Sequence, residues 1–215
     1  MSDTLQTTSG RELESGGFAI IDQEAGSHHF PPDEWQIVRR VIHATADFEF
    51  LDLMCFSPGA TRAGVEALEA GCPIVVDMSM ISSGPNSERL TERGCTVHSF
   101  ISDDDVIASA RAHNSTRAIE AMRKAHALGV LDGAIAAVGN APTALLALRD
   151  LVRDHGARPA LVIGVPVGFV SAAESKEATL GLDVPHIVAR GRKGGSVVAV
   201  AILQALLAQA SAPAL

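Results

Sequence analysis

The chain has 215 residues, 47% of them hydrophobic, which is enough to bury one sizeable core. Its 17 basic and 25 acidic residues give a formal net charge of −8, which argues against a nucleic-acid-binding surface. Residues 1–6 lack the basic and apolar segments of an export signal, so we expect a cytoplasmic protein. No linker rich in Pro, Gly or Ser divides the chain. We therefore expect a flexible segment over residues 1–12 and a single domain over residues 13–215.

The cysteines argue against a disulfide-bonded protein, and the most apolar segment argues against a membrane-spanning one. Cys55, Cys72 and Cys95 are widely spaced without a CxxC pair, as is typical of reduced thiols in the cytosol. The apolar run over residues 197–210 contains Gln204 and is shorter than the roughly 20 residues that a membrane span needs. This run predicts a buried helix, and we expect no membrane partner.

Gly16 and Gly17 form the first distinctive feature along the chain. Paired glycines predict a turn, or a close approach of the backbone to another group.

The next predicted helix carries the candidate catalytic residue. Two prolines and two acidic residues at its start predict a helix over residues 31–45. On a helical wheel, Arg39, Arg40 and His43 lie together, and Asp47 joins them if the last turn persists. The two cations favour a neutral imidazole and Asp47 favours an imidazolium, so His43 is suited to proton transfer near neutral pH. The alternative is a structural histidine that hydrogen-bonds to backbone at a helix end.

The following segments predict a parallel sheet covered by helices. Residues 48–53 alternate apolar and acidic side chains, which predicts a strand with one covered face. Residues 60–70 have the composition of a helix, closed by a glycine. Strands are predicted over residues 73–76, which are wholly apolar, and over residues 97–101. Asp77 stands at the carboxyl end of the first of these two strands.

Polar residues next mark two helix starts. The acidic run over residues 102–105 predicts a helix terminus rather than a calcium site, because further ligands at set intervals are absent. Thr116 belongs to a group of capping residues in front of a second helix. Arg117, in its first turn, opposes the helix dipole, which favours an anion bound nearby. A solvated arginine is the alternative.

Two buried strands, over residues 134–138 and 161–165, each lead into a loop of small residues and then a helix. In an open parallel sheet such loops lie at the carboxyl ends of the strands, where ligands bind. The first loop contains Asn140, and the second contains Ser171 and leads to Lys176. Ser171 also has capping-box spacing with the glutamate three residues later, so its role could be purely local.

A last strand, over residues 186–189, runs into a loop with three cations and three glycines before the apolar helix. Arg190, Arg192 and Ser196 belong to this loop. Exposed amides, cations and a helix amino terminus together predict an anion-binding loop, although its glycine spacing is not that of a Walker motif. A solvated basic turn is the alternative.

The motifs that are missing narrow the chemistry. The histidines are scattered and the cysteines unpaired, no GxGxxG opens a strand-turn-helix unit, and no GxSxG elbow is present. We therefore expect neither a metal nor a cofactor. A histidine acid/base with loops that bind a multiply carboxylated ligand suits an isomerisation driven by proton transfer.

Several of these motifs, in matching order, resemble the precorrin-8X methylmutase family. The similarity extends over about residues 11–207, and its motifs lie at residues 40–48, at Asp77 with Met80 and Gly84, at Thr116 and Arg117, and at residues 140–145, 166–176 and 190–196.

This resemblance implies a three-layer α/β/α, flavodoxin-like fold with a mainly parallel sheet, a homodimer, and a cofactor-independent isomerase of cobalamin biosynthesis. The family moves a methyl group from C11 to C12 of the corrin ring of precorrin-8X or cobalt-precorrin-8. The proton donor and acceptor of the family maps onto His43, and a substrate-contacting arginine maps onto Arg40. A second contact, usually serine, falls on Gly17, where the hydroxyl is missing. The amide of Gly17, Ser15 or water would have to replace it.

The candidate substrate-binding residues are Gly17, Arg40, Asp77, Thr116, Arg117, Asn140, Ser171, Lys176, Arg190, Arg192 and Ser196. Two alternative functions belong to other classes. A non-catalytic flavodoxin-like module that binds a nucleotide or tetrapyrrole anion would leave His43 without a role. An acyl hydrolase using Ser171 or Ser175 is disfavoured by the missing elbow.

Overall fold

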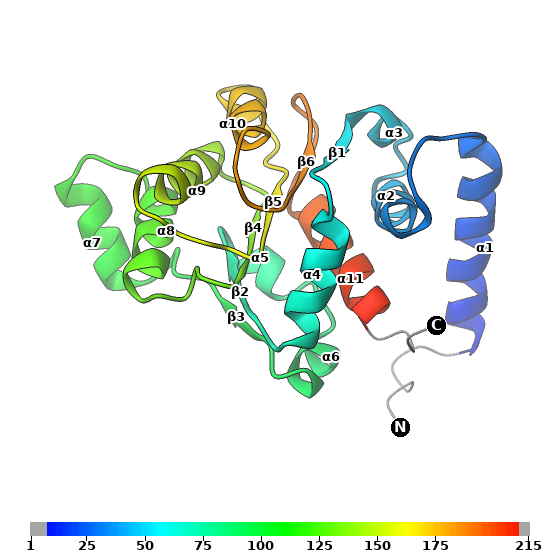
Figure 1. The fold of residues 1–215 in the computed structure, drawn as a ribbon, viewed down its shortest axis with the longest axis horizontal. Coiled ribbons are helices and arrows are strands. Elements are labelled where there is room, and N and C mark those ends of the chain that lie inside the picture. Colours follow the sequence, from blue (N-terminus) through cyan, green and yellow to red (C-terminus); the bar gives the residue numbers. More distant parts are fainter. Residues whose placement is uncertain (1–7, 211–215) are drawn as a thin grey trace.

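A computed structural model describes residues 8–210 and shows a six-stranded sheet with helices on both faces (Figure 1). The strands are β1 Met54–Phe56, β2 Pro73–Val76, β3 Thr96–His98, β4 Ile135–Val138, β5 Leu161–Gly164 and β6 His186–Ala189. Their order in the sheet is β1-β6-β5-β4-β2-β3, and every neighbouring pair is parallel except β1 with β6. The predicted α/β class and mainly parallel sheet are therefore confirmed.

The helices divide between the two faces of the sheet. They are α1 Thr8–Ala25, α2 Pro32–Thr45, α3 Phe50–Leu53, α4 Ala60–Glu69, α5 Ser79–Ser82, α6 Ser87–Glu92, α7 Asp104–Ala112, α8 Arg117–Ala127, α9 Pro142–Asp154, α10 Ala172–Thr179 and α11 Ser196–Ala210. Helices α7 to α10 lie on one side, whereas α2, α4 and α11 lie on the other, with α1 outside α2 (Figure 1).

Each face of the sheet has its own hydrophobic core. On β2, Ile74 and Val76 belong to the core that contains α11, and Val75 belongs to the core that contains α8 and α9. Successive side chains of a strand point to opposite faces, so a strand buried on both faces must be apolar throughout. This explains why β2, β4 and β5 were recognisable as apolar runs; β6 departs from the rule at His186, whose ring nitrogen hydrogen-bonds with the carbonyl of Val184.

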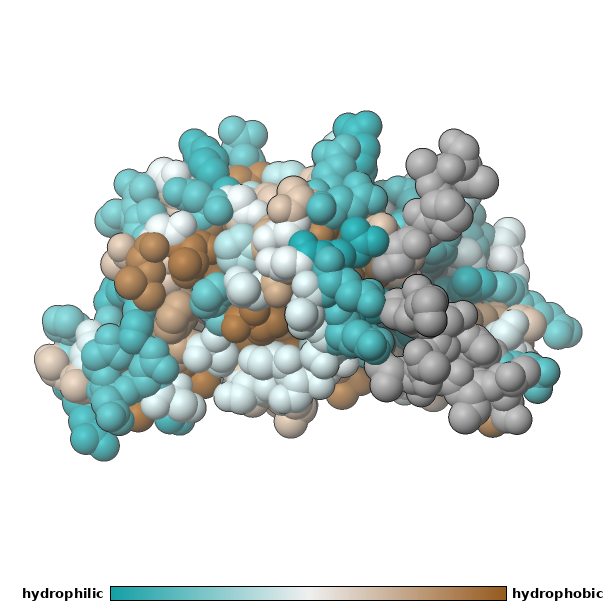
Figure 2. All heavy atoms as spheres, turned by 90° about the horizontal axis from the view of Figure 1, so that it is seen from below, coloured by the Kyte–Doolittle hydropathy of each residue, from teal (hydrophilic) through white to brown (hydrophobic). Residues whose placement is uncertain are grey.

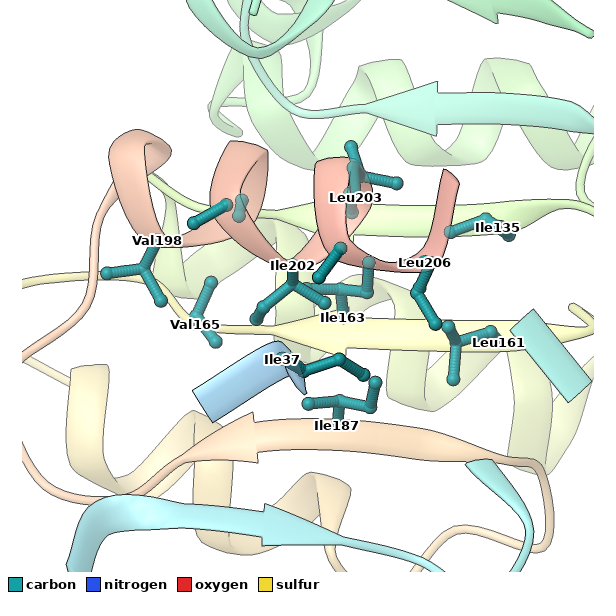
Figure 3. Packing of buried hydrophobic residues seen from close by; sticks show 14 of the residues in the cluster. Ile37, Ile135, Leu161, Ile163, Val165, Ile187, Val198, Ile202, Leu203 and Leu206 are labelled. Atoms are coloured by element: carbon teal, nitrogen blue, oxygen red, sulfur yellow. The ribbon is translucent and has the colours of Figure 1, made fainter. Parts of the chain in front are cut away.

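Helix α11 is the centre of the larger core. Val198, Ile202 and Leu206 are fully buried, and Figure 3 shows them beside β5 with Ile37 of α2 nearby. The predicted buried helix is confirmed. Within the described part of the chain, none of the helices combines the length and the apolar character that a bilayer crossing requires.

Three local predictions are wrong. Gly16 and Gly17 do not form a turn, because they lie inside α1, which also contains residues 8–12; the remaining residues 1–7 lie outside the described part of the chain. Residues 48–53 do not form a strand. The carboxylate of Asp47 accepts a hydrogen bond from the amide of Glu49, and the chain then turns into α3, so the strand begins only at Met54. Strand β3 also ends earlier than predicted.

Gly84, which follows α5, provides a test of the packing between α5 and α11. A Cβ added there would lie 2.3 Å from Cγ2 of Val200. We expect Gly84→Ala to lower the free energy of unfolding by about 1–3 kcal/mol through overpacking. Gly16→Ala is the control, because nothing lies within 4 Å of its added Cβ and it should gain up to about 1 kcal/mol of helix propensity. Denaturant unfolding measures both; equal shifts would contradict this account.

Candidate active site

His43 lies in the last turn of α2, where the chain is held from both ends. Proline and two acidic residues begin the helix, in accord with the steric and dipole preferences of a helix start. Val41 and Ile42 are buried, and Ala46 ends the helix in the left-handed conformation with its amide bonded to the carbonyl of Ile42. The imidazole is on the exposed side of α2. The predicted helix and its histidine are therefore where the sequence placed them.

The imidazole faces a cavity of about 280 Å³ between α2, α5 and α11. Its lining includes Arg40, Met80, Gly84, Ser196, Val197 and Gln204. Most of this lining is apolar or backbone. The cavity therefore offers one proton-exchanging side chain among groups suited to a hydrophobic ligand.

Helix α1 closes against the imidazole from the other side. The rings of Phe18 and His43 are 4.9 Å apart between centroids. A Cβ added to Gly17 would lie 3.0 Å from Nε2 of His43, whereas one added to Gly16 would meet nothing within 4 Å. Gly17 thus provides the close backbone approach that was the alternative to a turn. Phe18 was not identified from the sequence, where its only signal was its position after Gly17.

The two arginines of α2 bind the acidic side chains of α1. Arg39 is 2.8 Å from a carboxylate oxygen of Asp22, and Arg40 is 3.0 Å from one of Glu14. Both guanidinium groups also lie over Phe18, 4.6 and 5.2 Å from its ring centroid. Arg40 still lines the His43 cavity, so it can meet a ligand there as well as its partner on α1.

Asp47 does not join His43. Helix α2 ends before it, and its carboxylate instead lies 2.5 Å from Nζ of Lys193. The hydrogen bond from Lys193 lowers the pKa of Asp47, with a further contribution from the amide of Glu49. Lys193 also lies 2.9 Å from the carboxylate of Glu49. The condition for the predicted cluster, a persistent last turn, is not met.

A second cavity, of about 570 Å³, lies at the carboxyl ends of β2 and β4. In the sheet, β2 has β3 on one side and β4 on the other. The order of the strands therefore reverses at β2, which makes this end of the sheet a topological switch point. Asn140, in the loop after β4, lines it, as predicted for a loop at the carboxyl end of a parallel strand, and Thr116 and Arg117 at the start of α8 line it as well. The hydroxyl of Thr116 accepts from the amide of Ile119 and so caps α8.

Asp77 is almost fully buried at the base of this second cavity. Its carboxylate accepts hydrogen bonds from the amides of Gly139, Asn140 and Ala141, at 3.0, 2.9 and 2.7 Å. Burial raises the pKa of Asp77, although the three amides act in the opposite direction. Its role in the structure is to hold the β4–α9 loop, so it contributes to the site through that loop.

The predicted anion-binding loop is mostly held by its own contacts. Lys176 is completely buried and donates to the carbonyls of Gly191 and Lys193, at 2.9 and 2.6 Å, and burial lowers its pKa to about 8. Arg190 lies 3.3 Å from the carboxylate of Glu177. The guanidinium of Arg192 lies 5.4 Å from the ring centroid of Phe169. None of these three cations lines either cavity.

Two polar residues of α11, Ser196 and Gln204, line the His43 cavity. The hydroxyl of Ser196 donates to the sulfur of Met78, and the amide of Gln204 donates to the carbonyl of Gly84. Ser171, in contrast, adopts the left-handed conformation and forms no side-chain cap, so the capping-box alternative is wrong, and it lines neither cavity. Gln204 was missed as a site residue, and its signal was a single polar residue inside a long apolar run.

Comparison with known proteins gives concordant matches over nearly the whole chain. A model of the precorrin-8X methylmutase family matches residues 12–209. The cobalt-precorrin-8 methylmutase of Leptospira interrogans is 53% identical over 207 residues, covering 94% of both chains. That of Priestia megaterium is 48% identical over 200 residues, covering 93% of this chain and 88% of the relative.

A solved structure gives the same result. The precorrin-8X methyl mutase of Thermus thermophilus matches with a TM-score of 0.88 and 53% identity, covering 94% of this chain and 96% of that one. Sequence and fold therefore agree, and this chain belongs to the precorrin-8X methylmutase family.

Proposed function

We propose that this protein is a cobalt-precorrin-8 or precorrin-8X methylmutase, an isomerase that moves a methyl group from C11 to C12 of the corrin ring. The observation that carries the proposal is the exposed imidazole of His43 at an apolar cavity, in a chain of this family. The name of the relatives at 53% and 48% identity includes cobalt, so the cobalt form is the first substrate to test.

The proposed chemistry needs a proton to be lent and returned. Histidine exchanges protons near neutral pH. Protonation by His43 would make the conjugated ring electron-poor and lower the barrier to a 1,5-sigmatropic methyl shift. The methyl group breaks its bond to C11 as it forms one to C12, and the proton returns to His43. Substrate and product are isomers, which agrees with the isomerase class of the relatives.

Two regions support the binding of carboxylate side chains. Arg40 lines the His43 cavity beside the imidazole. Arg117 and Asn140 are exposed at the second cavity, where the amino terminus of α8 also favours an anion. Ser196 also lines the His43 cavity, but its hydroxyl would have to leave the sulfur of Met78 to donate to a carboxylate. We propose Arg40, Arg117 and Asn140 as carboxylate ligands, in place of Lys176 and Arg190, which line neither cavity.

The protein is further proposed to be a homodimer. Phe169 and Val170 are 84% and 81% exposed on one loop, and Leu13 and Ile20 are 78% and 56% exposed on α1. Large apolar side chains in water favour association. Figure 2 shows hydrophobic patches between larger hydrophilic areas on the face seen from below.

The three cysteines are free thiols, which supports a reducing, cytoplasmic location.

Replacement of His43 tests the mechanism. We expect His43→Ala to abolish conversion while the coloured tetrapyrrole remains bound, because only the proton donor is lost. The change in the absorption spectrum of precorrin-8X or its cobalt form measures conversion. His113→Ala is the control, since that exposed histidine lies at the end of α7 and lines neither cavity. Turnover by the His43 variant would refute the assignment, and ligand binding without turnover by the unsubstituted protein would favour a non-catalytic module.

The glycine pair of α1 tests the geometry around the imidazole. Gly17→Val would push its branched side chain into His43, whereas Gly16→Val would enter open space. Both changes alter the intrinsic helix propensity by the same small amount, in favour of the helix. Displacement of a catalytic group by about 1 Å can reduce the rate about 100-fold, so we expect a loss in kcat of that order for Gly17→Val only. Equal kcat values for the two variants would contradict the proposed contact.

Arg117 tests the role of the second cavity. If it binds a substrate carboxylate, Arg117→Ala should raise KM about tenfold, the value of one charge-assisted hydrogen bond, and leave kcat within about twofold. Arg153→Ala is the matched control, because Arg153 is exposed in the last turn of α9 and lines neither cavity. Steady-state kinetics separate the two parameters. An unchanged KM would remove Arg117 from the binding site.

A further inference from the structure

The His43 cavity adjoins the second cavity, which lies at the topological switch point between β2 and β4 and is the switch-point cavity below. The two cavities meet at one side chain. Among the described residues that line them, Met80 alone lines both. The two cavities have similar chemistry, because apolar side chains line most of each. The first has Val197 and Val200 beside His43, and the second has Ile101 beside Thr116. Met80 therefore stands where two mostly apolar spaces meet.

The chain that follows Met80 is held by two contacts, whereas Met80 itself is exposed. The next residue, Ile81, is fully buried and lies against Gly139, where an added Cβ would be 3.0 Å from its Cδ1. Gly84 follows, and its carbonyl accepts from Gln204. Met80 is nevertheless 61% exposed. A flexible thioether is thus presented from a fixed position, which suits adaptable contact with a large apolar surface.

The sizes of the cavities indicate that the substrate must occupy both of them. Pockets for drug-sized ligands are roughly 300–1,000 Å³. The His43 cavity, at about 280 Å³, is below that range, and a corrin macrocycle with several carboxylate side chains is larger than a typical drug. A substrate that reaches His43 must therefore extend beyond this cavity. The adjoining space of about 570 Å³ lies across Met80 and carries the exposed Arg117 and Asn140.

We propose that Met80 is a substrate-positioning residue, on whose side chain the macrocycle rests with its reacting edge at His43 and its carboxylate side chains in the switch-point cavity. This inference rests on the proposed function and adds a contact in the middle of the ligand. The thioether fills the space beneath the ring and fixes how far the ring can slide towards either cavity. Met80 thereby sets the distance between the reacting carbons and the imidazole.

Three substitutions at Met80 test whether its side chain contacts the substrate. Met80→Leu keeps volume and apolar character, so KM should stay within about twofold. Met80→Ala removes most of the contact and lets the ring slide away from His43, so it should raise KM about tenfold and lower kcat as well. Met80→Trp should block the passage between the cavities and raise KM more than Met80→Ala does. Leu128→Ala is the matched control, because Leu128 is 57% exposed at the end of α8 and lines neither cavity.

Conversion of cobalt-precorrin-8 and of precorrin-8X, followed by absorption, gives KM and kcat for each variant, and thermal unfolding confirms that each is folded. The proposal is supported by the KM order leucine, alanine, tryptophan, with Leu128→Ala unchanged. Normal conversion by the unsubstituted protein, with the alanine and tryptophan variants equal to Leu128→Ala in KM, would overturn the role of Met80 alone. Absence of conversion by the unsubstituted protein would overturn the proposed function, and this inference with it.

Discussion

The structure depends on the burial of α11 between the sheet and α2. Nine of its residues are buried, and it packs against α2, α4 and β5. Figure 3 shows the contact with β5, with Ile37 of α2 nearby. Burial of apolar side chains of this size is the main stabilising contribution in a core. Because Val41 and Ile42 of α2 belong to the same core, the burial of α11 also fixes His43. Its exposed Val197 and half-buried Gln204 form the opposite wall of the cavity.

Many charges near the site hold segments of the chain together. Arg39 and Arg40 join α2 to α1 through carboxylates, and Lys193 joins its loop to the turn after α2. Lys176 performs the same task with backbone carbonyls, which keeps a buried ammonium hydrogen-bonded. Each of these contacts connects residues far apart in the sequence. A cation near a cleft is therefore a guide to a ligand only after its partners within the fold are known.

The sequence predicted most of the scaffold and the position of His43, because those features follow from local rules. Apolar runs identified β2, β4 and β5, and the prolines and acids placed the start of α2. It could not predict contacts that depend on tertiary structure. The glycine pair predicted a turn, but Gly17 lies in a helix against His43, a contact between two helices that no local pattern specifies. Lys176 was predicted to bind a ligand, but its ammonium group donates to a backbone carbonyl of the loop that covers it. The pattern over residues 48–53 was misleading because its two acidic residues, Glu49 and Asp52, are three positions apart, a spacing that also fits one turn of a helix.

The clasp of three backbone amides around Asp77 has a thermodynamic consequence. The β4–α9 loop is already fixed to the end of β2 before any ligand arrives. A ligand that binds there loses its own freedom but orders no polypeptide, so little of its contact energy is lost to conformational entropy. Affinity in that region should consequently have a small entropic penalty, and mutations that loosen the clasp would appear as weaker binding without the loss of a single ligand contact.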